Sequence, residues 1–88
     1  MIVENIKLAR YDRIEDPGHS WLEVPISDVR KIGVLDKITP YSPKNAGFIY
    51  LEEDCDMFTF VDAMKSKGYS VEMNRVNVED FDSYLESV

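Results

Sequence analysis

The residues best suited to chemistry are an acidic run at 52–56 and the chain's one histidine and one cysteine. The run reads Glu-Glu-Asp-Cys-Asp, so Cys55 lies within it, whereas His19 lies far upstream. The carboxylates could bind a hard cation, but the run lacks the alternating oxygen ligands and the glycine of a calcium loop. One histidine and one cysteine are too few soft ligands for a structural zinc site. We therefore predict no metal and no cofactor.

The sequence also argues against catalysis by these residues. A nucleophilic Cys55 needs a nearby base and positive surroundings, and the flanking acids oppose formation of its thiolate. His19 and Glu23 fall on one predicted strand, where positions four apart are roughly 13 Å from each other. An acid–base pair would therefore need a carboxylate from another strand, such as Glu52. We name no catalytic residue and leave an enzymatic role open, with binding favoured.

A strand and a helix must position the acidic run. Residues 47–53 place apolar side chains on both faces, which is typical of an interior strand. An apolar stripe at i, i+3, i+4 and i+7 then predicts a helix, made by Met57, Phe60, Val61 and Met64. Asp54 or Asp56 is expected to cap this helix and Gly68 to close it. Residues 69–74 alternate again, which predicts a β-α-β unit with parallel strands.

The upstream half predicts a hairpin and a short helix. Residues 2–11 and 19–24 alternate, the polar segment 12–18 contains an Asp-Pro-Gly turn, and Pro25 ends the second strand. Ser27 is the expected cap of a helix that Gly33 terminates. Residues 34–45 contain two prolines and predict an irregular connection, anchored to the core by Ile38 and Tyr41.

The last segment predicts a helix capped by Asn77. Its buried side is expected to comprise Val78, Phe81, Leu85 and Val88, flanked by Tyr84. The 88 residues thus predict one α+β domain, residues 1–88, with the order β-β-α-β-α-β-α. Its four strands form a mixed sheet with helices packed on at least one face.

The period of two in the strands defines a candidate binding surface. If Leu22, Val24, Ile49 and Leu51 face the helices, the aromatic and charged residues between them face the other way. Joined to the acidic run, the candidate residues are His19, Trp21, Glu23, Phe48, Tyr50, Glu52, Glu53, Asp54 and Asp56. Tryptophan and tyrosine are enriched at interface hot spots. The alternative is that a helix or the 34–45 segment covers this face, so that its aromatic residues are core.

Charge and composition limit the partners. The net charge of −7 and a pI near 4.5 disfavour binding to nucleic acid or to an anionic membrane. No apolar run approaches the ~20 residues of a membrane span, and the start of the chain lacks the pattern of a signal peptide. A single cysteine fits a reducing compartment. We therefore expect a cytoplasmic protein, and leave homo-oligomers open.

Two motifs carry a family resemblance. Residues 16–25, DPGHSWLEVP, and 50–56, YLEEDCD, together resemble a group of small phage and plasmid proteins that share a domain of unknown function. The resemblance covers roughly residues 14–64, and relatives have a further tyrosine where this chain has Pro43, so the loop there is expected to differ. The resemblance implies no activity. It does imply an accessory protein of a phage or mobile element that acts in the bacterial host cytoplasm.

Three functional hypotheses follow. The first is a small non-catalytic protein that binds a host protein, in host takeover or against a defence system. The second is an inhibitor that imitates nucleic acid with its carboxylates. The third is a small enzyme or ligand-binding module that uses His19 with the carboxylates of 52–56.

Overall fold

The computed structural model describes residues 7–88, which form one five-stranded mixed sheet with three α-helices packed against it. In chain order the elements are β1 (Lys7–Glu15), β2 (Ser20–Pro25), α1 (Ile26–Ile32), the 3-10 turn η1 (Leu35–Lys37), β3 (Lys44–Asn45), β4 (Phe48–Glu52), α2 (Asp56–Ser66), β5 (Tyr69–Asn77) and α3 (Phe81–Ser87). The α+β class with a mixed sheet is confirmed. The fifth strand, β3, has only two residues and lies in the segment predicted to be irregular.

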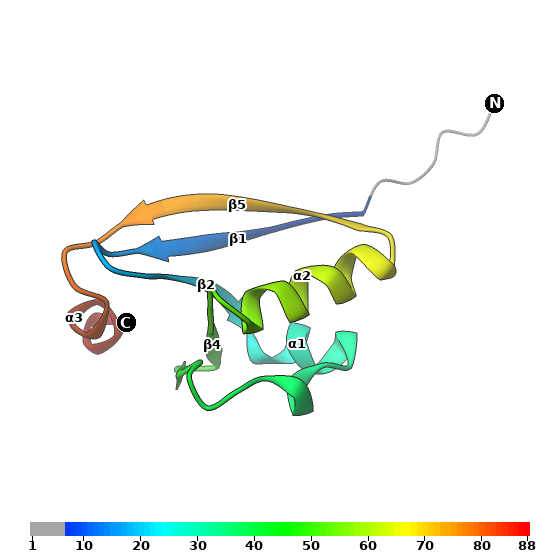
Figure 1. Ribbon diagram of the computed structural model, residues 1–88, viewed down its shortest axis with the longest axis horizontal. Helices are drawn as coiled ribbons and strands as arrows, with labels where there is room; N and C mark the ends of the chain where they lie inside the picture. Colours follow the sequence, from blue (N-terminus) through cyan, green and yellow to red (C-terminus); the bar gives the residue numbers. More distant parts are fainter. Residues whose placement is uncertain (1–6) are drawn as a thin grey trace.

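The strand order is β3-β4-β2-β1-β5. β2 is antiparallel to both β1 and β4, while β1 and β5 are parallel. β4 and β5 therefore run in the same direction, as the β-α-β pattern predicted, with β2 and β1 between them. All nine residues of β1 pair with β5, but only residues 12–15 pair with β2. The other ends of β1 and β5 consequently extend beyond the sheet as a two-stranded ribbon (Figure 1).

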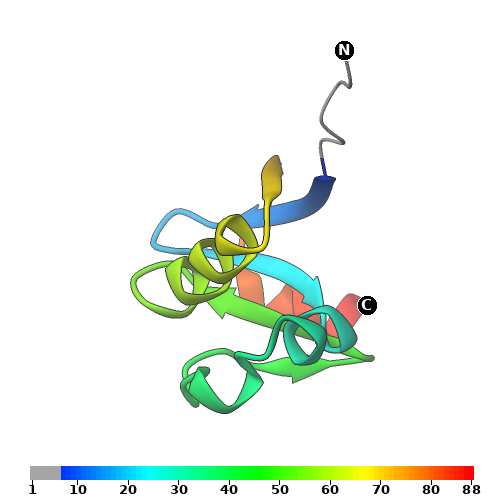
Figure 2. The same ribbon diagram turned by 90° about the vertical axis from the view of Figure 1, so that its right-hand side faces the viewer.

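Helices α1 and α2 cover one face of the sheet (Figure 2). The predicted inward residues Leu22, Val24, Ile49 and Leu51 are all fully buried there, together with the apolar stripe of α2. The ring of Tyr11 meets the ring of Phe60 edge-on at 5.4 Å between centroids. This cluster is the larger of the two apolar clusters, and it confirms the face assignment made from strand alternation.

Helix α3 covers part of the opposite face. Phe81 packs against Tyr50 and Ile14, and stacks on Trp21 with ring centroids 3.6 Å apart. Tyr50 is completely buried. The alternative in which a helix covers the aromatic face therefore holds for its centre, and Tyr50 is a core residue rather than part of an open surface. Val88, predicted to be buried, is 53% exposed because α3 packs chiefly through Phe81, with Leu85 partly buried.

The first strand lies further along the chain than the sequence predicted. Residues 2–6 of the predicted strand lie outside the described part of the chain. β1 continues through residues 12–15, which were predicted to belong to the polar segment between the two strands. Neighbouring strands on both sides stabilise this polar segment. Ile14 enters the core, and Arg13 forms ion pairs with Glu15 and Glu53. Tertiary partners thus stabilise strand structure that local polarity did not predict.

Three of the predicted helix caps are wrong. α1 begins at Ile26 after Pro25 without a side-chain cap, so Ser27 lies inside it. The cap position of α2 is Cys55, again without a side-chain hydrogen bond. Asp80, rather than Asn77, caps α3 by accepting a hydrogen bond from the Ser83 amide. The predicted helix-terminating glycine of α1 is confirmed, because Gly33 adopts a left-handed conformation.

A tight turn joins β3 to β4. Asn45 pairs with Phe48, so Ala46 and Gly47 are the two central residues of the turn. Both have positive φ, 51° and 85°. Positive φ at both central residues is the geometry of a primed two-residue hairpin turn. Asparagine and glycine are preferred at these positions, and alanine is strained.

Candidate functional site

An open hollow of about 590 Å³ lies at the corner between β4 and α2. Three segments meet there: the end of the β1–β2 turn, the loop before β3, and the acidic run. The hollow is lined by His19, Trp21, Thr39, Tyr41, Glu52, Asp54 and Cys55. The fold thus brings together four of the nine candidate residues: His19, Trp21, Glu52 and Asp54. We call this site the aromatic–acidic hollow.

The aromatic side of the hollow combines one fixed ring with one exposed ring. Trp21 is held flat against Phe81, with 9° between the ring planes, and His19 lies 5.8 Å from it between ring centroids. Tyr41 is 79% exposed. The prediction that Tyr41 anchors its loop in the core is therefore wrong, whereas Ile38 does pack against the main cluster. An exposed aromatic ring such as that of Tyr41 suits contact with a partner.

Asp16 fixes the turn that presents His19. One carboxylate oxygen accepts hydrogen bonds from the backbone amides of Gly18 and His19, each at 2.9 Å. The other oxygen accepts from the amide of Phe81 at 3.3 Å, which ties the turn to the start of α3. The bonds from the His19 and Gly18 amides are the main reason that the pKa of Asp16 lies below its ordinary value. The Asp-Pro-Gly motif is thereby explained as a structural unit.

Asp56 fixes the loop that presents Tyr41. Its side chain is completely buried. Its carboxylate accepts hydrogen bonds from the Thr39 hydroxyl at 2.6 Å, from the Ser42 hydroxyl at 2.5 Å, and from the Thr39 amide at 3.1 Å. Thr39 and Ser42 are on either side of Tyr41 in the loop. Asp56 is therefore a positioning residue of the core and not a surface ligand, contrary to its place among the candidate residues.

The other three acids of the run differ in their contacts. Glu53 accepts hydrogen bonds from both the amide and the hydroxyl of Ser20, and lies 3.6 Å from Arg13. Glu52 and Asp54 line the hollow instead. Partial burial, followed by the charge of Asp54, raises the pKa of Glu52 above its ordinary value. One Glu52 oxygen accepts a hydrogen bond from the Asp54 backbone amide at 3.2 Å. A cation in the hollow would relieve the repulsion between the two carboxylates.

Three further candidate residues lie away from the hollow: Glu23, Phe48 and Tyr50. One oxygen of Glu23 accepts hydrogen bonds from the hydroxyls of Tyr50 and Tyr84, both at 2.9 Å. Burial and this carboxylate raise the pKa of both tyrosines, that of Tyr84 to about 12. Phe48 packs against the α3 cluster. Glu23 therefore joins β2, β4 and α3, and its role in the fold is structural.

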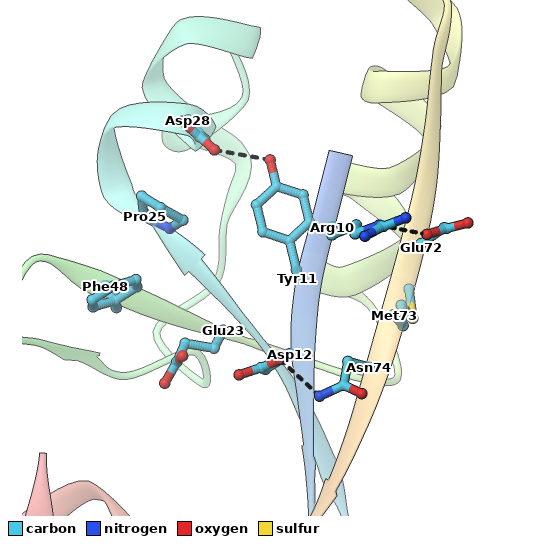
Figure 3. Close-up of a pocket in the computed structure, with 10 residues that line it drawn as sticks. All are labelled: Arg10, Tyr11, Asp12, Glu23, Pro25, Asp28, Phe48, Glu72, Met73 and Asn74. Atoms are coloured by element: carbon cyan, nitrogen blue, oxygen red, sulfur yellow. Dashed lines mark hydrogen bonds and ion pairs between the residues drawn. The ribbon is translucent and has the colours of Figure 1, made fainter. Parts of the chain in front are cut away.

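Glu23 and Phe48 do border a second hollow, of about 730 Å³, between the β1–β5 ribbon and α1 (Figure 3). Its other carboxylates each accept a hydrogen bond from a side chain of the protein. Asp28 accepts from the Tyr11 hydroxyl at 2.8 Å, Asp12 accepts from the Asn74 amide group, and Glu72 accepts from Arg10 (Figure 3). The charges of this second hollow are thus engaged within the fold.

The aromatic–acidic hollow contains the chain's one histidine and its one cysteine. His19 and Cys55 line it together, but within residues 7–88 no hydrogen bond joins the imidazole to a carboxylate or to the thiol. A nucleophile activated by a base requires such a contact. Over the same residues, no group of three histidine, cysteine, aspartate or glutamate side chains is arranged to hold a metal ion.

The sequence missed Tyr41 as a member of the site. The signal that could have found it is its place between Pro40 and Pro43, in a stretch too short to bury every side chain. No helix in the described part of the chain is long and apolar enough to cross a membrane. No family model, no curated protein and no solved structure matches the chain.

Proposed function

We propose that this chain is a non-catalytic binding protein that recognises a basic segment of a partner protein through the aromatic–acidic hollow. The observation that carries the proposal is the exposed ring of Tyr41 in the same hollow as Trp21 and the carboxylates of Glu52 and Asp54. A lysine or arginine side chain can interact with both features. Its positive charge is attracted to the carboxylates, and its aliphatic stem or planar guanidinium group packs on aromatic faces. The chain's net charge of −7 steers a basic partner to the site.

The partner proposed is a host protein of the bacterial cytoplasm. The motifs at 16–25 and 50–56 support this through their resemblance to phage and plasmid proteins. The structure gives these motifs a shared place, since they supply His19 and Trp21 on one side of the hollow and Glu52, Asp54 and Cys55 on the other. A binding role in the host fits the small size of the domain and the open form of the hollow.

Imitation of nucleic acid has less support than protein binding. A mimic needs several exposed carboxylates, but Asp56 is completely buried and Glu53 is engaged by Ser20 and Arg13. The same burial weakens the hypothesis of an enzyme that uses the whole 52–56 run with His19. One exposed acid, Asp54, and one partly buried acid, Glu52, beside two aromatic rings suit one cationic side chain better than a phosphate-like array.

The test is affinity capture of the tagged protein from nuclease-treated bacterial lysate, with mass spectrometry. Tyr41→Ala removes the exposed ring, and Phe58→Ala is the matched control, because Phe58 is 64% exposed on α2 and does not line the hollow. We expect a stoichiometric partner that is lost with Tyr41→Ala and retained with Phe58→Ala. Retention by both variants would refute the site. Tyr50→Ala is unsuitable as a test because it would open a cavity in the core.

A second test addresses the charge. Glu52→Gln with Asp54→Asn removes two charges at the hollow, and Glu79→Gln with Asp82→Asn removes two exposed charges elsewhere. We expect only the first pair to weaken capture of the partner. Binding should also weaken as the pH is lowered through the raised pKa of Glu52, because protonation removes the charge that attracts the cation. Equal effects of the two pairs would indicate general electrostatics instead.

A further inference from the structure

A second kind of site lies at the opposite end of α2. The aromatic–acidic hollow includes Cys55, directly before α2, whereas this other hollow, of about 620 Å³, includes Lys67, directly after it. Its apolar wall residues come one each from β1, α1, α2 and β5, and comprise Ala9, Ile32, Met64 and Tyr69. Three lysines border them, one each from β1, α1 and the end of α2: Lys7, Lys31 and Lys67. We call this site the lysine hollow.

The charge of the lysine hollow is opposite to that of the whole chain. Four of the ten basic residues border it, in a chain whose net charge is −7. Arg10 is engaged by Glu72 at 2.8 Å, and the one acid of the hollow, Asp28, accepts a hydrogen bond from Tyr11 (Figure 3). None of the three lysines forms an ion pair with another described residue. Three lysines without an ion pair among the described residues therefore border one hollow that also has apolar walls.

Helix capping does not account for this convergence. Lysines near the C-terminus of a helix can complement its dipole, and Lys31 and Lys67 lie near two such ends. One carbonyl in the last turn of each helix already accepts a backbone hydrogen bond: Arg30 accepts from the Gly33 amide at 3.0 Å, and Lys65 accepts from the Gly68 amide at 2.9 Å. Lys7 belongs to a strand, and its ammonium group lies 5.3 Å from the centroid of the Tyr69 ring in the same hollow.

We propose that the lysine hollow binds a small amphipathic anion, with a carboxylate or phosphate head at the lysines and a short apolar chain on the walls. The combination is what such a ligand needs, because the ammonium groups supply charge-assisted hydrogen bonds and the apolar walls supply hydrophobic burial. The size of the hollow lies within the range of small-molecule sites. This binding is independent of the partner proposed above, since the two hollows share no residue.

The test is a titration of the ¹⁵N-labelled full chain with octanoate, acetate and 1-octanol, followed by amide chemical shifts. Octanoate combines the charge and the chain, acetate carries only the charge, and octanol carries only the chain. We expect saturable shifts at residues such as Ala9, Ile32 and Tyr69 with octanoate, and binding of the other two at least about tenfold weaker. Octyl phosphate, added in a parallel arm, distinguishes a phosphate head from a carboxylate head.

Variants make the test specific to the lysines. Lys31→Gln with Lys67→Gln should weaken octanoate binding by roughly tenfold or more, as expected when charge-assisted hydrogen bonds are lost. Lys37→Gln with Lys65→Gln removes the same charge from exposed sites outside the hollow and should leave binding unchanged. All four lysines are exposed, so both variants should remain folded, which the amide spectrum itself reports.

Two results would overturn the proposal. One is the absence of saturable shifts around the lysine hollow with both octanoate and octyl phosphate. The other is an octanoate affinity that acetate or octanol equals, or that the two double lysine variants lower to the same extent. Either outcome would indicate adsorption of an ion or an alkyl chain without a specific site.

Discussion

Removal of the Asp56 carboxylate should destabilise the whole domain. Asp56 is completely buried, and its oxygens accept hydrogen bonds from the Thr39 amide, the Thr39 hydroxyl and the Ser42 hydroxyl. Asp56→Ala would leave these donors without an acceptor in the interior. A hydrogen bond to a charged group contributes about 1.5–3 kcal/mol, and such bonds to one group are not additive. We therefore expect a loss of about 3 kcal/mol from a domain whose total stability is about 5 kcal/mol.

Urea unfolding followed by circular dichroism measures this loss. With an m-value of about 1 kcal/mol per M, the midpoint should fall by roughly 3 M. Asp56→Asn keeps one carbonyl oxygen as an acceptor and should cost less, about 1–2 kcal/mol. Asp54→Ala is the matched control, because Asp54 is an exposed acid two positions away and its loss should stay within about 0.5 kcal/mol.

The comparison between the two alanine variants decides the reasoning. If Asp56→Ala costs no more than Asp54→Ala, the buried network does not hold the 39–42 loop and the run at 52–56 is a solvated acidic surface. If the network does hold the loop, Asp56→Asn should also weaken partner capture while the domain remains folded. The site and the fold would then be linked through Thr39, which lies beside Tyr41 in the same loop.

Three other measurements follow from single contacts. Tyr84→Phe should cost about 1 kcal/mol at neutral pH, since it removes a hydrogen bond to Glu23. The pKa of Tyr84 is raised to about 12, so the stability that Tyr84 contributes is complete below pH 10 and is lost as the pH rises from 10 to 12. The melting temperatures of wild type and Tyr84→Phe should therefore converge over that interval. A constant difference between them would contradict this assignment. Ala46→Gly should raise the melting temperature by a few degrees, because Ala46 holds φ at 51°, and a fall would mean that the turn needs the methyl group. Asp16 has a lowered pKa, so its contribution is present above its ordinary pKa of 3.8 and is lost as the pH falls further. The difference in melting temperature between wild type and Asp16→Asn should therefore shrink as the pH falls below about 4. A difference of the same size at about pH 4 and at about pH 2 would exclude this role.

The sequence determined the elements whose signals are periodic. Alternation in residues 47–53 and the stripe of α2 identified the strand and the helix that form the corner, because one buried face imposes a period of two or 3.6 on the residues within it. The same alternation assigned Leu22, Val24, Ile49 and Leu51 to one face. It also placed His19, Trp21 and Glu52 together on the other side of the sheet, and two motifs pointed to that corner.

Only the tertiary structure decided what each polar residue does. Asp54 and Asp56 are chemically alike and two positions apart, yet one lines a hollow and the other is buried, because Thr39 and Ser42 come from a distant loop to satisfy it. The two tyrosines differ from their predictions in the same way. Tyr50, expected on an open surface, is buried beneath α3, whereas Tyr41, expected in the core, is exposed. A polar side chain is buried only where partners from elsewhere in the chain replace its water, and those partners are chosen by the fold and not by the local sequence.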